Sequence, residues 1–425
     1  MLFSRRNLVL VLLMSVMVIS VLDKSIFAFA GAQIIDELKL TPAEFGFIGS
    51  AFFFLYSISG VAVGFLANRF PSRWILVGMS LVWMVSQLLV AVSSSFMALV
   101  ASRLMLGAGT GPGTAVTQHA CFKWFGPTER VMPASLIQVS IMLGAIFAAV
   151  SLPFLIAQVG WRLAYAGLAA LGLVWMLLWL AFGREGSHVD AAAQPVSGPL
   201  PGYRRLLLNR TFLGITLVGF VGYLPNALIY SWVPLYLQKG LGMTPMQSGY
   251  AVMSVTLAVI LCNLLVSALS QRALARGAAV QRAMVALPLA CCLGAGLAFV
   301  TLAQAHGHLL ATLALYACGA VLINVLPTFA NTIVAFIAPD ARRGSMLSIH
   351  IGGLTSAGML APWLVGQMVA GQGDDIARGF ELSLVLIGVA ILASTLLAFW
   401  LVRPQLTREQ LQVAEPLRQA TLQPN

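Results

Sequence analysis

Charged residues are scarce in this chain of 425 residues: Asp, Glu, Lys and Arg make up 9% of it, whereas hydrophobic residues make up 60%. The mean hydropathy is +0.92. A soluble domain of this length needs far more charge to cover its surface, so the composition excludes a soluble globular protein. It indicates an all-α integral membrane protein that crosses the bilayer many times.

Motifs that would support other functions are missing as well. No Gly-x-x-x-x-Gly-Lys-[Ser/Thr] phosphate loop occurs, which argues against an ATP-driven pump. The five cysteines lie in apolar runs without Cys-x-x-Cys spacing, so we predict neither a disulfide framework nor a metal site. We expect no enzyme activity and no cofactor. The net charge of +11 lies in short loops, which favours orientation in a membrane over nucleic-acid binding.

Twelve apolar runs are long enough to cross a bilayer as helices, which need roughly 20 residues. They cover about 8–30, 45–67, 74–92, 98–122, 133–157, 163–182, 211–236, 248–270, 284–303, 309–338, 345–370 and 380–402. Most Lys and Arg residues fall in loops on one side, which predicts cytoplasmic termini in a bacterial-type inner membrane. The exceptions are Lys39, Arg162, Lys239 and Arg378 on the other side, and Lys24 and Arg103 within spans.

A polar loop over Gly183–Asn209 divides the spans six and six, and an internal repeat supports the division. Thr41-Pro42-Ala-Glu-Phe-Gly46 recurs as Thr244-Pro245-Met-Gln-Ser-Gly249, with threonine able to cap a helix that begins at proline. We predict a six-helix bundle at 1–182, a cytoplasmic linker at 183–210, a second bundle at 211–403 and a cytoplasmic tail at 404–425. Repeated halves of like topology place a ligand site between them near the midplane.

Asp23 and Lys24 lie inside the first apolar run, where each ionisable side chain costs about 2.5–3.5 kcal/mol. Neighbouring residues on a helix point about 100° apart, so each charge needs a partner of its own. We predict Asp23 as the proton carrier and Lys24 as the anchor for a substrate carboxylate. The alternatives are a permanent partner role for Asp23 and a structural or proton-coupled role for Lys24.

Polar residues on other spans extend this hypothesis. On the fourth span, helical spacing aligns one polar stripe, in which Arg103 is expected to join Asp23 in proton coupling rather than snorkel outward. Glycines on that span are interpreted as packing positions, and Gln87 and Asn263 as contacts between helices. Pro327 is expected to bend the tenth span. The predicted substrate-binding residues are Lys24, Tyr56, Thr110, Thr114, Gln118, Asn226, Tyr230, Asn324 and Asn331.

Several motifs resemble those of the major facilitator superfamily. The loop Gly64-Phe-Leu-Ala-Asn68-Arg69-Phe-Pro71-Ser72-Arg73 resembles its signature between the second and third spans, although Asn68 replaces an aspartate. The resemblance implies the major facilitator fold, twelve transmembrane helices in two six-helix bundles. It also implies a gating loop that would include Asn68, Arg69 and Arg73, although the missing aspartate weakens its charge-based latch.

Within that superfamily the chain resembles the anion–cation symporters, which include bacterial galactonate and phthalate permeases. Leu22-Asp23-Lys24-Ser25 is similar to their Asp-Arg pair, and Arg103-Leu-Met-Leu-Gly107-Ala-Gly109-Thr110-Gly111-Pro112 to their fourth-span motif. Thr110 stands where the family commonly has an acid, which implies altered proton coupling.

The resemblance implies a proton-coupled symporter of a small organic anion such as a sugar acid or aromatic carboxylate, driven by the proton gradient. We expect the protein to be a monomer. The alternative is a proton-driven exporter of a drug-like or siderophore-like compound. The fifth span argues against export, because it lacks the Gly-Pro motif that antiporters of this superfamily usually carry there.

Overall fold

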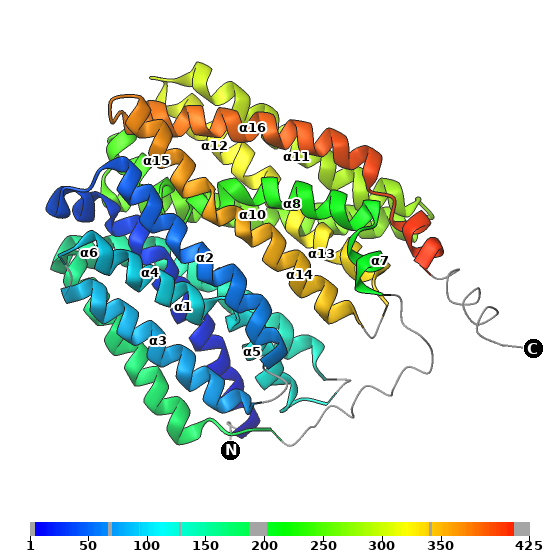
Figure 1. Ribbon diagram of the computed structural model, residues 1–425, viewed down its shortest axis with the longest axis horizontal. Helices are drawn as coiled ribbons and strands as arrows, with labels where there is room; N and C mark the ends of the chain where they lie inside the picture. Colours follow the sequence, from blue (N-terminus) through cyan, green and yellow to red (C-terminus); the bar gives the residue numbers. More distant parts are fainter. Residues whose placement is uncertain are drawn as a thin grey trace, which may run out of the picture. The chain divides into compact units, whose positions relative to one another are not determined.

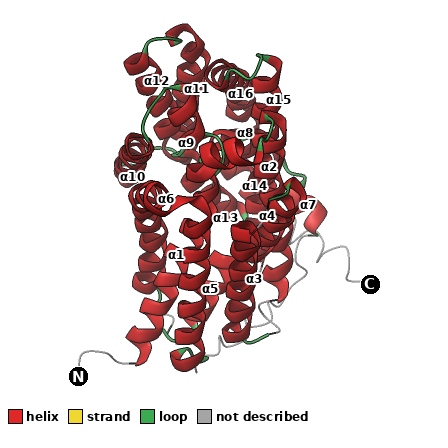
Figure 2. Cartoon of the chain, turned by 90° about the vertical axis from the view of Figure 1, so that its left-hand side faces the viewer, coloured by secondary structure: helices red, strands yellow, loops and turns green. Residues whose placement is uncertain are grey.

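The structure is a computed structural model of residues 1–425. It describes residues 5–66, 70–92, 94–126, 129–186, 202–339 and 342–411. Within these ranges the regular elements are all helices (Figure 1), and no strand is present among them (Figure 2).

The first half of the chain contributes α1 (Arg5–Leu38), α2 (Pro42–Leu66), α3 (Ser72–Val92), α4 (Phe96–Thr110), α5 (Gly113–Phe122), α6 (Val131–Phe182) and α7 (Tyr203–Leu207). The second half begins with α8 (Arg210–Leu228), α9 (Val233–Leu235), η1 (Tyr236–Gly240), α10 (Pro245–Ala275), η2 (Gln281–Ala286), α11 (Leu287–Thr301) and η3 (Leu302–Ala305). It continues with α12 (Leu309–Ile323), α13 (Leu326–Ile337), α14 (Arg343–Thr355), η5 (Ser356–Met359), α15 (Ala361–Gly371) and α16 (Ile376–Leu401).

Nine helical segments in the described ranges are long and apolar enough to cross a membrane. α6 holds two of the predicted spans, separated at Gly160, whose φ of 78° is a left-handed conformation that favours glycine. The predicted fourth span is divided into α4 and α5 around Gly111 and Pro112, and the eleventh into α14 and α15 by the turn η5. Two predicted spans thus lie in one long helix, and two others are each divided into helices too short to cross a membrane alone. The twelve predicted spans therefore correspond to nine such segments.

The repeated Thr-Pro motifs form matching helix starts in the two halves. The Thr41 N–H donates to Glu44 Oε2 over 2.8 Å, and the Glu44 N–H donates to Thr41 Oγ1 over 3.2 Å. In the second half, the Thr244 N–H donates to Gln247 Oε1 over 2.9 Å, and the Gln247 N–H donates to Thr244 Oγ1 over 3.2 Å. The predicted threonine caps are therefore confirmed, each before a helix that begins at proline.

The chain forms two compact units, each assembled from segments that are separate in the sequence. Unit 1 comprises Met1–Asp190, Ala227–Leu257 and Gly358–Ser383, and unit 2 comprises Ala191–Asn226, Ala258–Ala357 and Leu384–Asn425. The boundaries predicted at 1–182, 183–210, 211–403 and 404–425 stay a prediction. Much of the linker, residues 187–201, and most of the tail, residues 412–425, lie outside the described residues.

Unit 1 is built from helices in close contact. α1 packs along α6, and α2 packs along α4. A Cβ added at Gly107 would lie 2.0 Å from the Phe52 carbonyl oxygen, and one added at Gly111 would lie 2.2 Å from that of Tyr56. The predicted packing role of these fourth-span glycines is confirmed, because only a hydrogen at these positions lets α4 approach α2 so closely.

Unit 2 confirms two further expectations about its helices. The tenth span divides into α12 and α13 next to Pro327, which is the second residue of α13. Asn263 on α10 donates to the Asn324 carbonyl oxygen over 3.1 Å and accepts from Thr328 Oγ1 over 3.2 Å. Its amide is thus the predicted contact between helices, at the point where the proline interrupts the backbone ladder.

Candidate functional site

Asp23 is held inside unit 1 by a glutamine. Its side chain is 2% exposed, and Gln87 Nε2 on α3 donates a hydrogen bond to Asp23 Oδ1 over 2.6 Å. Gln87 is itself buried. A carboxylate taken out of water needs such donors, because an unpaired buried charge is costly. The predicted contact of Gln87 between helices is confirmed, and its partner is the predicted proton carrier.

Lys24 points to a different neighbour, as the 100° rotation per residue requires. Its ammonium nitrogen lies 5.7 Å from the centre of the Tyr230 ring, within the range of a cation–π contact. The side chain is partly exposed. Among the described residues, no hydrogen bond or ion pair to a carboxylate is recorded for it. Lys24 interacts electrostatically with the neighbouring Asp23, but its ammonium makes no direct ion pair in the described part of the chain and can bind a ligand carboxylate.

Arg103 lies on α4, with its guanidinium carbon 4.0 Å from the centre of the Phe27 ring. It is 3% exposed, and its Nη2 has no hydrogen-bond partner within the described part of the chain. It interacts electrostatically with Asp23 and with the buried Tyr165 hydroxyl on α6. Arg103 is therefore near Asp23, but its closest recorded partner is the aromatic ring.

The remaining predicted substrate-binding residues of the first half differ in their exposure and in the contacts that their side chains already make. The Thr110 hydroxyl donates to the Leu106 carbonyl oxygen over 2.5 Å, so it is engaged with its own helix. Thr114 is exposed and Gln118 partly exposed, and both lie on α5 beyond the break after α4. Tyr56 is partly exposed and interacts electrostatically with Tyr230. Two tyrosines thus accompany Lys24.

The predicted asparagines of the second half mostly bond to their own helices. Asn226 donates to the Gly222 carbonyl oxygen over 3.5 Å, and Asn324 to that of Ala320 over 2.8 Å. The Asn331 amide oxygen is buried without a partner in the described part of unit 2. A substrate contact of these residues stays a prediction.

The sequence did not identify three residues as members of this cluster. Gln87 was recognised only as a polar contact, and Phe27 and Tyr165 look like ordinary apolar-run residues in the sequence. Their importance comes from helix packing, which brings α1, α3, α4 and α6 together around Asp23. Within the described ranges, no group of three or more His, Cys, Asp or Glu residues could hold a metal ion.

The combination of a helical membrane fold, two capped repeats and a buried charge cluster agrees with a family comparison. The model of the Major Facilitator Superfamily matches residues 13–334. The chain belongs to this superfamily. The match confirms the family resemblance and the twelve-helix fold class expected from the sequence.

Several curated proteins that resemble this chain are named as transporters of sugar acids. The hexuronate transporter of Bacillus subtilis (strain 168) is 26% identical over 255 residues, 57% of this chain and 60% of the relative. The probable L-galactonate transporter of Escherichia coli (strain K12) is 29% identical over 248 residues, 54% of this chain and 53% of the relative. The chain thus spans less than two thirds of the length of these relatives.

Solved structures of the superfamily have the same fold. A bacterial homologue of the human lysosomal transporter Spinster, in an inward-facing and occupied conformation, has a TM-score of 0.80 at 17% identity, covering 96% of this chain and 98% of that one. A D-xylose–proton symporter has a TM-score of 0.74 at 17% identity, covering 94% and 99%.

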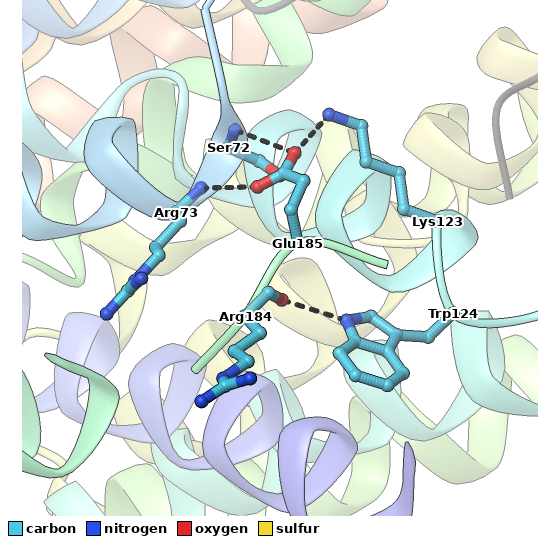
Figure 3. A network of polar contacts seen from close by, with 6 residues as sticks. All are labelled: Ser72, Arg73, Lys123, Trp124, Arg184 and Glu185. Atoms are coloured by element: carbon cyan, nitrogen blue, oxygen red, sulfur yellow. Dashed lines mark hydrogen bonds and ion pairs between the residues drawn. The ribbon is translucent and has the colours of Figure 1, made fainter. Parts of the chain in front are cut away.

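A polar network lies at the N-terminus of α3, at Ser72 and Arg73 (Figure 3). The Glu185 carboxylate accepts hydrogen bonds from the N–H and hydroxyl of Ser72, from the N–H of Arg73, and from Lys123. Partial burial alone would raise the pKa of Glu185, but these donors outweigh it and hold that pKa below its ordinary value. The carboxylate caps α3 from the chain beyond α6.

Of the predicted gating-loop residues, Arg73 is part of this network. Its guanidinium donates to the Leu180 carbonyl oxygen over 2.7 Å, and its carbonyl oxygen accepts from the Trp179 indole over 3.1 Å. Asn68 and Arg69 lie outside the described residues. Arg73 therefore connects the start of α3 to the end of α6 within unit 1. A gating role stays a prediction.

Proposed function

We propose that this protein is a secondary active transporter that takes up a small organic anion, with at least one proton, by alternating access across a bacterial-type inner membrane. The relatives named for hexuronate and galactonate transport favour a sugar acid as the substrate. The positive-inside distribution of Lys and Arg supports cytoplasmic termini. The energy source is the proton gradient, without a cofactor.

One observation carries the proposal: two cations, the buried Arg103 and the half-buried Lys24, both interact electrostatically with the buried Asp23 carboxylate in unit 1. Asp23 is bound by the neutral Gln87, while Lys24 faces Tyr230 and Arg103 faces Phe27. With Asp23 ionised, these three side chains carry a net charge of plus one. A membrane-buried site with excess positive charge attracts an anion, and Lys24 is the ammonium that a substrate carboxylate reaches.

The same sum of charges indicates whether binding of a proton strengthens or weakens binding of the anion. Protonation of Asp23 raises the net charge of the three side chains to plus two, so it strengthens the attraction for the anion. A bound anion in turn stabilises the additional positive charge, since the coupling between two ligands is reciprocal. Proton and anion therefore favour each other's binding in the same cycle, which is the requirement for symport.

Uptake into proteoliposomes tests this function. We expect radiolabelled galactonate or glucuronate to accumulate when the outside is acidic, and a protonophore to abolish the accumulation. Uptake of the corresponding neutral sugars should stay at the level of empty liposomes. Accumulation that is indifferent to the protonophore would exclude proton coupling, and export driven by an opposite gradient would favour the antiporter alternative.

A further inference from the structure

A continuous line of aromatic side chains leads away from the charge cluster toward the end of unit 1 where α1 is followed by α2. The Arg103 guanidinium lies over Phe27, and the Phe27 ring stacks on Phe45 with centroids 4.7 Å apart and planes at 13°. The Phe45 ring meets the edge of Trp232 at 5.1 Å and 87°. The Trp232 indole donates to the Pro362 carbonyl oxygen over 2.9 Å. All three rings are at most 1% exposed.

The end of this line is a tight seam between segments that are distant in the sequence. A Cβ at Gly46 would lie 2.5 Å from the Pro362 carbonyl oxygen. One at Gly49 would lie 3.0 Å from the side chains of both Pro362 and Ser231. α2 therefore contacts α15 and the residues around Trp232 nearly backbone to backbone.

An ion pair and a hydrogen bond add to the seam. Lys239 pairs with Asp36 beyond the end of the apolar run, where both residues are exposed. The Trp363 N–H donates to Ser50 Oγ over 2.9 Å. Segments after residue 226 are thereby bound to α1 and α2 at this end of unit 1, so the seam is a closure, and the predicted topology makes it the outer one.

We infer that Phe27 and Phe45 are positioning residues of the transport cycle, which make the closure around Trp232 depend on where the Arg103 guanidinium lies. The inference rests on the proposed transport function and adds a physical link between the charge cluster and one gate. Its basis is the unbroken contact from Arg103 through two stacked rings to Trp232.

Each step of the line has a physical reason to transmit a displacement. Arg103 has an unpaired Nη2 within the described part of the chain and rests on the Phe27 face, so its position is determined by that ring and by nearby Asp23. A cation over an aromatic face is attracted by the ring, and more strongly where water is excluded. Buried rings cannot separate without opening a void, which a close-packed interior resists. Movement of Arg103 toward an anion therefore removes support from Phe27 and from the closure.

A cysteine reporter at Ser231 tests the inference without measuring transport. Ser231 is 1% exposed, its hydroxyl has no partner among the described residues, and it lies in the seam next to Gly49. In purified full-length protein in detergent, the rate at which S231C reacts with a maleimide reports opening of the closure. The chain without this substitution gives the background from its five native cysteines.

Phe27→Leu and Phe45→Leu in the S231C chain should each raise the labelling rate about two- to tenfold, the range expected for loss of one aromatic pair. Arg103→Gln should raise it similarly, and the double variant Phe27→Leu/Arg103→Gln should label no faster than the faster single one. Phe54→Leu is the matched control, because Phe54 lies on the same helix as Phe45 but is 50% exposed; its labelling rate should not change.

The inference is overturned if Phe27→Leu and Phe45→Leu label like Phe54→Leu, or if Arg103→Gln leaves the labelling rate unchanged. If Phe45→Leu does not give monodisperse protein, Phe45→Met, whose flexible side chain fills irregular gaps better, replaces it with the same expectation. Because labelling needs neither substrate nor a proton gradient, absence of galactonate uptake in the parent chain would reject the proposed function and leave this result readable.

Discussion

At the scale of single residues, Asp23 and Lys24 are adjacent in the sequence but contact different partners. The proposed function gives them different roles, proton transfer for Asp23 and anion binding for Lys24. The helix rotation directs Asp23 to Gln87 and Lys24 to Tyr230. Gln87 has no charge, so it holds the Asp23 carboxyl in place without fixing its charge as a salt bridge would. In the proposed transport cycle, Asp23 gains and loses a proton while its position is kept, and Lys24 binds the anion.

We predict that Asp23→Asn abolishes gradient-driven accumulation but spares exchange of substrate across the membrane. An asparagine side chain has the same shape and can still accept from Gln87, but it cannot carry a proton. Uptake under an imposed pH gradient and counterflow without one measure the two activities separately. Asp374→Asn, at an exposed loop position, is the control and should behave like the parent chain. Normal accumulation by Asp23→Asn would remove Asp23 from its role.

For Lys24 we predict that a substitution that keeps the positive charge is tolerated, whereas one that removes the charge is not. Lys24→Arg should retain anion transport, whereas Lys24→Gln should raise KM about tenfold or more, since a charge-assisted hydrogen bond contributes about 1.5–3 kcal/mol. Initial uptake rates over a range of galactonate concentrations measure this effect. The exposed Lys39→Gln is the matched control. A fully active Lys24→Gln variant would contradict the anchor role.

At the scale of elements, the start of α3 depends on a carboxylate from the other end of the bundle's sequence. Glu185 takes the place of a local cap by accepting from the N–H groups of Ser72 and Arg73. Glu185→Gln should lower the free energy of unfolding by about 1 kcal/mol, a value reduced for solvent screening of a carboxylate that is one third exposed. Glu129→Gln, which removes the carboxylate of a more exposed ion pair, should change it less.

The pH dependence of this contribution follows from the lowered pKa of Glu185. A carboxyl with a lower pKa in the folded than in the unfolded chain contributes stability above its ordinary value of 4.5. That stability is lost as the pH falls through the folded value. Thermal unfolding in detergent should therefore separate the parent chain from Glu185→Gln at pH 7, and the difference should shrink below pH 4. A difference that persists there would exclude the carboxylate as its cause.

Elements that rest on local chemistry could be predicted from the sequence, whereas contacts made across the bundle could not. The Thr41 and Thr244 caps and the interruption at Pro327 follow from neighbouring residues, and the structure has them. The Gln87–Asp23 hydrogen bond joins residues far apart in the sequence, and the sequence offered many other polar residues as possible partners of Asp23. The break between α4 and α5 was also missed, because helical spacing alone carries a stripe straight across it.

At the scale of the whole molecule, composition was the strongest guide. Apolar runs of sufficient length can only be membrane helices, and the repeat predicts two halves of like topology, so the fold class followed before any side chain was placed. The site itself depends on which faces the helices turn toward each other. Lys24 and Asp23 were predicted from the cost of burying charge, but the Phe27 ring under Arg103 has no such signature.

The final prediction concerns the coupling of two ligands through the whole protein. If the net charge around Asp23 sets the attraction for the anion, galactonate should bind more tightly at pH 5.5 than at pH 7.5, although its own carboxyl is ionised at both. Reciprocity requires that anion binding draws a proton onto the protein by the same factor. Thermal stabilisation at a series of galactonate concentrations measures the affinity at each pH, since stabilisation grows with the ratio of ligand concentration to Kd.

Two variants should separate the pH dependence of galactonate binding, assigned to Asp23, from the binding itself, assigned to Lys24. Asp23→Asn keeps both cations and cannot ionise, so galactonate should bind with the same Kd at both pH values, close to that of the parent chain at pH 5.5. Lys24→Gln should lose most of the stabilisation at either pH. A parent chain whose Kd is equal at pH 5.5 and 7.5 would show that the anion and the proton bind independently, and symport through this charge cluster would have to be abandoned.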